Sequence, residues 1–171
     1  MSNSYKIAVL PGDGIGPEVT AESVKVLNVL AQAFQYKFEF EYAKMGAEAI
    51  FETGNPLPEE TLTVCKNADA VLFGAIGDPY FDNNPDAKVR PEQGLLKLRK
   101  ELGLFANIRP IKTYSSLTKK SPLKKEIVDG TDIQIYRELI SGIYFGEKFT
   151  DENGEFAYDI CKYNKDEIVQ I

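Results

Sequence analysis

The sequence contains no histidine, only two cysteines and no long apolar run. Without histidine, proton transfer by this chain must use tyrosine, lysine or a carboxylate, and a histidine-ligated zinc site is excluded. Cys65 and Cys161 follow no metal-binding spacing, so we expect reduced thiols. No stretch approaches the roughly 18 apolar residues of a membrane span. The first residues lack the regions of a signal peptide, and we expect a cytoplasmic protein without a membrane partner.

An excess of positive charge is also lacking. The formal net charge of −6 over 171 residues argues against nucleic acid or an anionic membrane surface as a partner. Hydrophobic residues make up 43% of the chain and charged residues 27%, which indicates a globular protein rather than a disordered one. The length suits one domain or two small ones.

Strands and helices alternate through the first part of the sequence. Residues 6–10 predict a short buried strand, and after a glycine-rich segment the apolar residues of 19–34 recur at helical spacing. Residues 68–75 are almost continuously apolar, which predicts a central parallel strand covered on both faces. The alternation predicts an α/β fold with a parallel-rich sheet and flanking helices.

The glycine-rich segment 11–18 follows the first strand. Its three alternate glycines permit either a sharp turn into the helix or a close approach of the backbone to a ligand. The spacing differs from the dinucleotide fingerprint, and no P-loop lysine follows. Ligands of α/β sheets bind beyond the carboxyl ends of the strands, where this segment and the turn-rich residues 76–93 fall. Glu92 then lies in the first turn of a helix, where a carboxylate also serves as a plain cap.

The segment 91–110 predicts a helix that stops at Gly103, followed by a short strand. Leu95 and Leu96 lie four and three residues before Arg99, so all three share one helical face. Apolar methyl groups beside a guanidinium would suit a ligand with a branched hydrocarbon arm and a carboxylate. The same spacing also fits an amphipathic helix with leucines in the core and solvated arginines.

Two further arginines lie on predicted strands. Arg109 ends the strand that begins at residue 105, and Arg137 has the parity of Ile133 and Ile135 in a later strand. Arg137 is therefore predicted to point inward with the apolar residues, where it needs an anionic partner, either a ligand or a structural carboxylate. Tyr144 follows between glycines, and without a role in chemistry it would be an amphipathic residue at the rim of the sheet.

The last part of the sequence predicts a β-hairpin at 149–163, with its turn at 151–154. An isolated hairpin is marginal in water, so we expect it to contact a partner surface such as a second subunit. Asn164 and Glu167 then form a capping-box pattern at the start of a helix.

Taken together, the motifs AVLPGDGIGPEV, RPEQGLLKLRKELGLFANIRP, and YREL followed by GIYFGE resemble the isocitrate/isopropylmalate dehydrogenase family. The resemblance covers almost the whole chain, but family members are roughly twice as long. It therefore implies two incomplete domains. Residues 1–103 would begin the cofactor-binding domain, and residues 104–171 would begin the substrate and dimerisation domain, with the hairpin at 149–163 as an arm between the subunits of a homodimer.

The resemblance also implies an activity, the NAD-dependent oxidative decarboxylation of 3-isopropylmalate in leucine biosynthesis, assisted by Mg or Mn. It assigns the substrate carboxylates and the isopropyl group to three arginines and two leucines, namely Arg99, Arg109, Arg137, Leu95 and Leu96. Tyr144 matches the tyrosine of proton transfer. Ile15, Asp78 and Glu92 match positions near NAD, although Asp78 replaces a common glycine.

The resemblance places the metal ligands, a catalytic lysine and the adenosine-binding loop in the carboxyl half of the family. We therefore assign no metal ligand to this chain and expect the 171 residues alone to be inactive. Two alternatives are a paralogue that acts on tartrate, homoisocitrate or isocitrate, and a non-catalytic remnant. Leu95 and Leu96 argue against a substrate with a charged arm.

Overall fold

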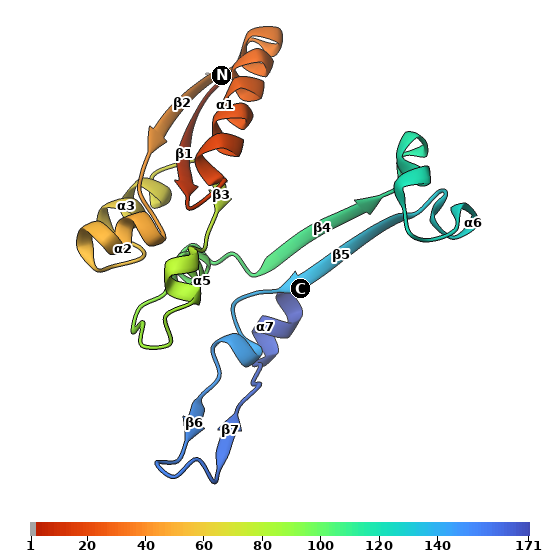
Figure 1. Cartoon of the computed structure of the whole chain (residues 1–171). Helices are drawn as coiled ribbons and strands as arrows, with labels where there is room; N and C mark the ends of the chain where they lie inside the picture. Colours follow the sequence, from red (N-terminus) through yellow and green to blue (C-terminus); the bar gives the residue numbers. More distant parts are fainter. Residues whose placement is uncertain (1–2) are drawn as a thin grey trace. The chain divides into compact units, whose positions relative to one another are not determined.

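A computed structural model describes residues 3–171, and the chain divides into two compact units. Unit 1 is Met1–Leu102, described from Asn3 onward, and unit 2 is Gly103–Ile171. The elements of unit 1 are β1 (Ser4–Gly12), α1 (Gly16–Phe34), β2 (Lys37–Tyr42), α2 (Ala47–Thr53), α3 (Glu59–Lys66), β3 (Ala70–Ala75), α4 (Pro79–Asp82) and α5 (Pro91–Glu101) (Figure 1).

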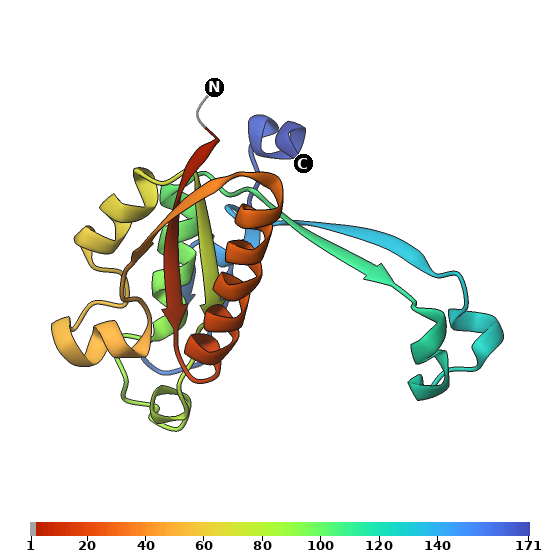
Figure 2. The same ribbon diagram turned by 90° about the horizontal axis from the view of Figure 1, so that it is seen from above.

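The sheet of unit 1 has three parallel strands in the order β2-β1-β3. Figure 2 shows α1 on one side of this sheet and α2, α3 and α5 on the other. The central strand β1 is covered on both faces, because Val9 and Leu10 point to opposite faces and both are fully buried. Leu10 lies in a core with Met45, Leu57 and Leu98. This core therefore joins β1 to the loops and helices on one face of the sheet.

The strand predicted at 68–75 was expected at the centre of the sheet, and that prediction is wrong. The observed strand, β3, lies at an edge of the described sheet, and Val71 to Ala75 are only half-buried. The apolar run correctly indicated a parallel strand, but the position of a strand in a sheet depends on its neighbours, which a local pattern does not encode.

The glycines of the segment 11–18 allow β1, β3 and α1 to pack closely. A Cβ on Gly12, whose φ is +69°, would lie 1.9 Å from the carbonyl oxygen of Ala75, and one on Gly16 would lie 2.0 Å from that of Pro11. Neither position has room for a side chain. The close approach that these glycines permit is thus between protein backbones, and the sharp turn from strand to helix follows from it.

Helix α5 begins and ends where the sequence predicts. Pro91 occupies its first turn, Leu102 is the C-cap residue, and Gly103 follows with φ +64°. Leu98 is buried in the core, and Leu95 packs against that core while remaining half-buried. Helix α5 therefore packs on the rest of unit 1 through one apolar side, and the side chains next to that side lie at the surface.

Unit 2 is built around a two-stranded antiparallel ribbon. Its elements are β4 (Ala106–Lys112), η1 (Ser115–Lys120), α6 (Lys125–Val128), β5 (Asp132–Glu138), η2 (Gly142–Tyr144), β6 (Lys148–Thr150), β7 (Ala157–Asp159) and α7 (Lys165–Gln170). Strands β4 and β5 pair along their whole length, and Figure 1 shows them as a long ribbon that leads to α6. In this unit Leu139 is the one buried hydrophobic side chain of the described residues.

The predicted hairpin and capping box are both present. Strands β6 and β7 pair in the antiparallel sense around a turn that includes Gly154. At the start of α7 the side chain of Asn164 accepts from the N–H of Glu167, and the Glu167 side chain accepts in return from the N–H of Asn164. In the described part of the chain, no helix has both the length and the apolar composition that crossing a membrane requires.

Candidate functional site

Two of the three predicted arginines lie on the same face of the β4–β5 ribbon. Asn107 pairs with Arg137, and Arg109 pairs with Ile135. Directly opposed residues of an antiparallel pair point to the same face, as do alternate residues of one strand. Arg109 and Arg137 are thus diagonal neighbours, a separation that long side chains span. Strand pairing alone therefore places two guanidinium groups together.

Arg137 contacts the predicted catalytic residue Tyr144. A terminal nitrogen of Arg137 donates a hydrogen bond to the Tyr144 hydroxyl, and the guanidinium carbon lies 5.3 Å from the centre of the Tyr144 ring. Because the hydroxyl oxygen accepts from Arg137, its own O–H remains a donor for another group. The short helix η2 therefore brings a proton donor to the arginine face of the ribbon.

The prediction that Arg137 points inward is wrong in one respect. Arg137 does share a face with Ile133 and Ile135, but that face is open, and the two isoleucines are 50% and 40% exposed. Parity was correctly predicted from the sequence. Burial was not, because side-chain parity is a local property, whereas the elements that cover a strand face come from other parts of the chain.

Neither ribbon arginine has a structural counterion. Within residues 3–171, no carboxylate forms an ion pair with Arg109 or Arg137, and the recorded side-chain partners are the neutral groups of Asn107 and Tyr144. The sequence left open whether Arg137 pairs with a ligand or with a structural carboxylate. Two adjacent uncompensated cations favour the ligand, because an anion bound there would relieve their mutual repulsion.

The remaining predicted substrate residues lie on α5 in unit 1. Leu95, Leu96 and Arg99 are all half-buried, and their spacing places them along one side of the helix. Leu95 packs against the core, so part of its surface is already covered. Leu96 lies outside the buried core cluster, so it is the more available of the two for contact with an apolar group.

The three predicted cofactor residues lie beyond the carboxyl ends of β1 and β3, an edge of a parallel sheet that commonly binds ligands. Ile15 is the N-cap residue of α1 and is 58% exposed. Asp78 caps α4, where its carboxylate accepts from the N–H of Tyr80 at 2.8 Å. Glu92 is in the first turn of α5, and its carboxylate lies 3.3 Å from where a Cβ on Gly77 would be.

Asp13 organises this edge and was not singled out from the sequence. Its buried carboxylate accepts from the N–H of Ala47 at 2.7 Å and from the N–H of Gly77 at 3.0 Å. It thus fixes the start of α2 and the loop after β3 to the loop after β1. The available signal was that Asp13 is the one carboxylate between the glycines of the segment 11–16.

No metal site can be assigned to these residues. Among residues 3–171, no group of three or more histidine, cysteine, aspartate or glutamate side chains is placed to coordinate a metal ion. The donor set of the described chain therefore does not fit a divalent cation held by this chain alone.

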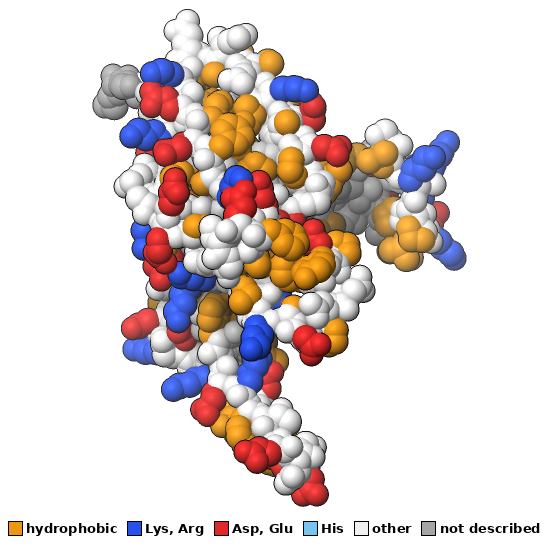
Figure 3. Space-filling view, turned by 60° about the vertical axis from the view of Figure 1, so that its left-hand side comes forward, with side chains coloured by type: hydrophobic (Ala, Val, Ile, Leu, Met, Phe, Trp, Pro, Cys, Tyr) orange, Lys and Arg blue, Asp and Glu red, His pale blue; other side chains and the backbone are white. Residues whose placement is uncertain are grey.

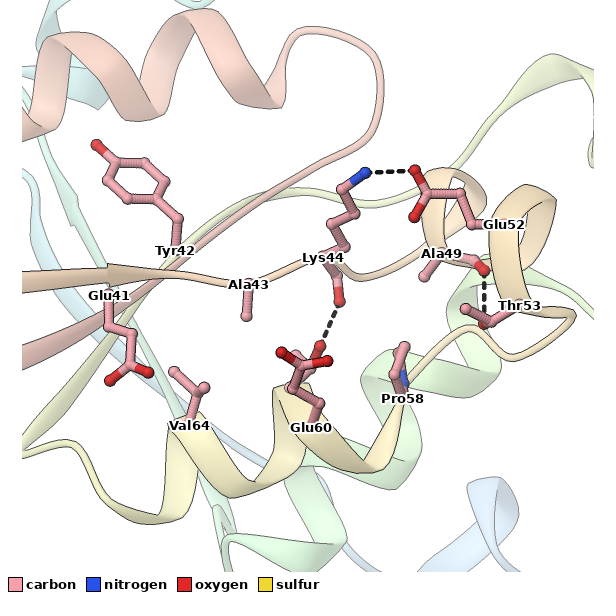
Figure 4. A pocket seen from close by; sticks show the side chains of 11 residues that line it. Glu41, Tyr42, Ala43, Lys44, Ala49, Glu52, Thr53, Pro58, Glu60 and Val64 are labelled. Carbon is pink, nitrogen blue, oxygen red and sulfur yellow. Dashed lines mark hydrogen bonds and ion pairs between the residues drawn. The ribbon is translucent and has the colours of Figure 1, made fainter.

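The hollow in Figure 4 contains none of the predicted site residues. It has a volume of about 400 Å³ and lies between the end of β2, α2 and α3. The Lys44 ammonium at its rim forms ion pairs with Glu48, at 3.0 Å, and with Glu52, and these hydrogen bonds raise the pKa of Lys44. The hydroxyl of Thr61 donates to the carbonyl of Lys44. Polar groups around this hollow thus pair with one another.

The parallel sheet of unit 1 with its flanking helices defines a protein of the α/β class, and the ribbon of unit 2 displays two exposed arginines, one of which contacts a tyrosine. A family model described as isocitrate/isopropylmalate dehydrogenase matches residues 6–171. The chain therefore belongs to the isocitrate/isopropylmalate dehydrogenase family.

Curated relatives agree with the family model. The chain is 57% identical over 167 residues to a 3-isopropylmalate dehydrogenase of Bacteroides fragilis, and the match covers 98% of this chain and 47% of the relative. It is 52% identical over 170 residues to the 3-isopropylmalate dehydrogenase of Aquifex aeolicus, with 98% of this chain and 46% of the relative covered. The chain thus spans about half the length of these relatives.

Solved structures show the same fold. A β-decarboxylating dehydrogenase from Thermococcus kodakarensis, in its apo form, matches with a TM-score of 0.66 and 34% identity over 97% of this chain and 42% of that one. An isocitrate dehydrogenase from Methylococcus capsulatus matches with a TM-score of 0.73 and 23% identity over 95% of this chain and 44% of that one, which supports the fold alone.

Proposed function

We propose that the full-length protein containing this chain catalyses the NAD-dependent oxidative decarboxylation of 3-isopropylmalate, a step of leucine biosynthesis. The observation that supports this most directly is the open ribbon face on which Arg109 and Arg137 have no carboxylate partner within the described chain. The names of the relatives from Bacteroides fragilis and Aquifex aeolicus support the same substrate.

The malate part of the substrate has two carboxylates, and the arginines provide the complementary charge. A guanidinium presents planar N–H donors that match the two oxygens of a carboxylate. Arg109 and Arg137 are diagonal neighbours on the ribbon, so they present two such forks from one surface. Arg99 on α5 is the third arginine of the proposed set. Guanidinium groups that pair with the two carboxylates would orient a dianion before reaction, which lowers the entropic part of the barrier.

The leucines of α5 account for the preference for an alkyl arm. Leu95 and Leu96 offer apolar atoms beside Arg99, and Leu96 is outside the buried core cluster. An isopropyl group against these side chains leaves water at no cost in hydrogen bonds. A carboxylate in the same place, as in isocitrate, would lose hydration without gaining a partner. The selectivity therefore combines attraction for the alkyl arm with a penalty for the charged one.

Tyr144 is the proposed proton-transfer residue. Its hydroxyl accepts from Arg137 and keeps its own proton for donation to a reacting carbon or oxygen. The chain has no histidine that could perform this step. Arg137 would thus contact both the substrate carboxylate and the tyrosine, which fixes the distance between the carboxylate and the proton donor.

NAD would accept the hydride from the secondary alcohol. Ile15, Asp78 and Glu92 are the residues of this chain that we assign to it, because they lie at the carboxyl edge of the parallel sheet. The exposed apolar surface of Ile15 suits contact with a ring. The described side chains offer no site for Mg or Mn.

The hairpin β6–β7 is the proposed arm of a homodimer. Phe149 stacks on Tyr158 at 5.5 Å between ring centres, while Phe149 and Phe156 remain 46% and 61% exposed. A two-stranded hairpin with aromatic side chains at its surface gains stability from a partner surface.

A cytoplasmic location fits the two free thiols, Cys65 and Cys161.

Steady-state kinetics of the full-length protein with NAD and Mg test the proposal. We expect kcat/KM for 3-isopropylmalate to exceed that for isocitrate by at least about a hundredfold, as expected when a charged group faces an apolar pocket. Arg137→Ala should lower kcat/KM by about a hundredfold or more, because a charged hydrogen-bonded partner of the substrate is lost. Lys125→Ala, on α6 rather than on any element that carries a predicted site residue, is the control.

A preference for isocitrate would contradict the assigned substrate. Full activity of Arg137→Ala would contradict the proposed site, whichever substrate is preferred.

A further inference from the structure

Asn107 contacts one of the ribbon arginines from the same strand. Its side-chain oxygen accepts a hydrogen bond from Nε of Arg109 at 2.6 Å. The two residues are separated by one position on β4, so they point to the same face, and Asn107 is directly opposite Arg137 in the register. Asn107, which is half-buried, is therefore a neighbour of both arginines on this face of the ribbon.

This hydrogen bond determines which donors of Arg109 remain for a ligand. A guanidinium has one N–H at Nε and two at each terminal nitrogen. With Nε engaged by Asn107, a carboxylate can use both terminal nitrogens together, but not the edge that includes Nε. The bound geometry is thus restricted to the end-on form, in which both carboxylate oxygens face the tip of the side chain.

The neutrality of Asn107 is as important as its position. An aspartate could accept the same hydrogen bond, but it would cancel the charge of Arg109 and repel an incoming carboxylate. The side-chain oxygen of Asn107 is engaged by Nε of Arg109. The NH₂ group of the same amide has no hydrogen-bond partner among residues 3–171. Asn107 thus adds N–H donors to this face without adding a negative charge.

We propose that Asn107 is a positioning residue for the substrate, because its amide oxygen holds Arg109 in the orientation that binds a carboxylate end-on. This inference rests on the proposed function for the identity of the ligand, a malate-type dicarboxylate. The arrangement of Asn107 and Arg109 is independent of that function and is tested separately.

The first test is the Nε–Hε resonance of Arg109 in the ¹⁵N-labelled chain, identified by its absence in Arg109→Lys. We expect Asn107→Ala to move this resonance to the position of a solvated arginine and Asn107→Asp to keep it displaced, because aspartate still accepts. Gln134→Ala is the matched control, since Gln134 lies on the same ribbon, pairs with Pro110 and points to the opposite face. An unchanged resonance in Asn107→Ala would overturn the proposal.

The second test is the kinetics of the full-length protein. Asn107→Ala should raise KM for 3-isopropylmalate about tenfold and leave KM for NAD unchanged, as expected when a bond that orients a charged group is removed. Asn107→Asp should raise it further, because the added carboxylate competes with the substrate. Equal KM values for the parent and Asn107→Asp would overturn the role of neutrality. An unchanged KM in Asn107→Ala would overturn positioning.

The two tests separate the inference from the proposed function. If the parent protein does not use 3-isopropylmalate but Asn107→Ala still releases the Arg109 resonance, the substrate assignment fails and the contact stands. If the parent uses 3-isopropylmalate and the resonance is insensitive to Asn107→Ala, the function stands and the positioning role fails. Thermal melting of each variant checks that a substitution at the half-buried Asn107 leaves the fold intact.

Discussion

The two units of the chain differ in what stabilises them. Unit 1 surrounds its central strand with a core that includes Leu10, Met45 and Leu98, all nearly inaccessible to solvent. Unit 2 consists mainly of two-stranded ribbons, and Leu139 is its one buried hydrophobic side chain among the described residues. Unit 1 therefore has its own hydrophobic driving force, whereas unit 2 depends mainly on backbone hydrogen bonds and short local contacts.

This difference matters for function because the arginines of the ribbon are displayed by the less stable unit. Two-stranded ribbons are marginal alone and gain stability from whatever they contact. Segments of low local stability are also those that move and bind. Unit 1 is not fully covered either, since Val26, Val29 and Phe34 on α1 are 59%, 65% and 64% exposed. Figure 3 shows hydrophobic side chains at the surface in several patches. Exposed large hydrophobic residues occur in both units, so both have apolar surface to bury.

The largest expected effect is that of a core substitution in unit 1. Leu10 is fully buried on β1, so Leu10→Ala should lower the free energy of unfolding of unit 1 by about 3–4 kcal/mol. Ile108 on the ribbon is 58% exposed, and Ile108→Ala should cost less than about 0.5 kcal/mol. Urea unfolding followed by circular dichroism measures both. Equal losses would contradict the contrast between the units.

The two thiols report the same contrast, one in each unit. Cys65 is 3% exposed, and burial raises the pKa of its thiol, whereas Cys161 is exposed. The thiolate is the reactive form, so iodoacetamide should label Cys161 at least about a hundredfold faster, with Cys65 reacting through opening of unit 1. Mass spectrometry of timed samples gives both rates. Comparable rates at neutral pH would mean that the core around Cys65 is open.

The raised pKa of the Cys65 thiol also predicts how the stability of unit 1 changes with pH. The folded chain favours the neutral Cys65 thiol, so its contribution is complete below the unfolded pKa of the thiol and is lost as the pH rises toward the folded value. Unit 1 should thus become easier to unfold on the alkaline side of the thiol range. Cys65→Ser is unsuitable as a control, because it buries a hydroxyl, and Cys65→Ala should abolish this alkaline trend.

Asp13 should have a smaller but clear effect on unit 1. Asp13→Ala would leave the buried N–H of Ala47 and the half-buried N–H of Gly77 without their acceptor, which should cost about 2 kcal/mol. Thermal melting measures the loss, and Asp86→Ala, an exposed acidic residue of the same unit, is the control. A loss no larger than that of the control would show that solvent replaces the carboxylate.

A local effect, confined to one short helix, is expected at α7 in unit 2. Asn164→Ala removes the cap that accepts from the N–H of Glu167 and should weaken this helix by about 1 kcal/mol. Ile168 and Val169 on α7 are 60% and 74% exposed, so little packing opposes the loss. Circular dichroism should show reduced helicity, while the melting of unit 1 stays unchanged. A parallel fall in the melting of unit 1 would show that the units are energetically coupled.

Local features of the fold were predictable from the sequence. The capping box at Asn164, the hairpin turn and the helix end at Gly103 depend on residues within a few positions of one another, and the structure confirms all three. The central position of β3 was predicted wrongly, because the neighbours of a strand come from distant parts of the chain. The exposure of Arg137 was missed for the same reason, since parity is local and covering elements are not.

The candidate site could be predicted as a set of residues but not as an arrangement. The motif FANIRP contains both Asn107 and Arg109, yet the diagonal relation to Arg137 requires the register of β4 and β5. The contact between Arg137 and Tyr144 likewise depends on how η2 follows the ribbon. Asp13 was visible as a carboxylate between glycines, but its acceptor role requires α2 and the loop after β3 to be placed around it.

Amide hydrogen exchange along the 171-residue chain tests the contrast between the units most directly. We predict slow exchange in β1, whose residues Ile7 to Leu10 are buried, and exchange at least about a hundredfold faster in β4 and β5, whose bonds open by local fluctuation. Protection of the β4–β5 ribbon as strong as that of β1 would contradict the account, because it would show that unit 2 is stable without a core of its own.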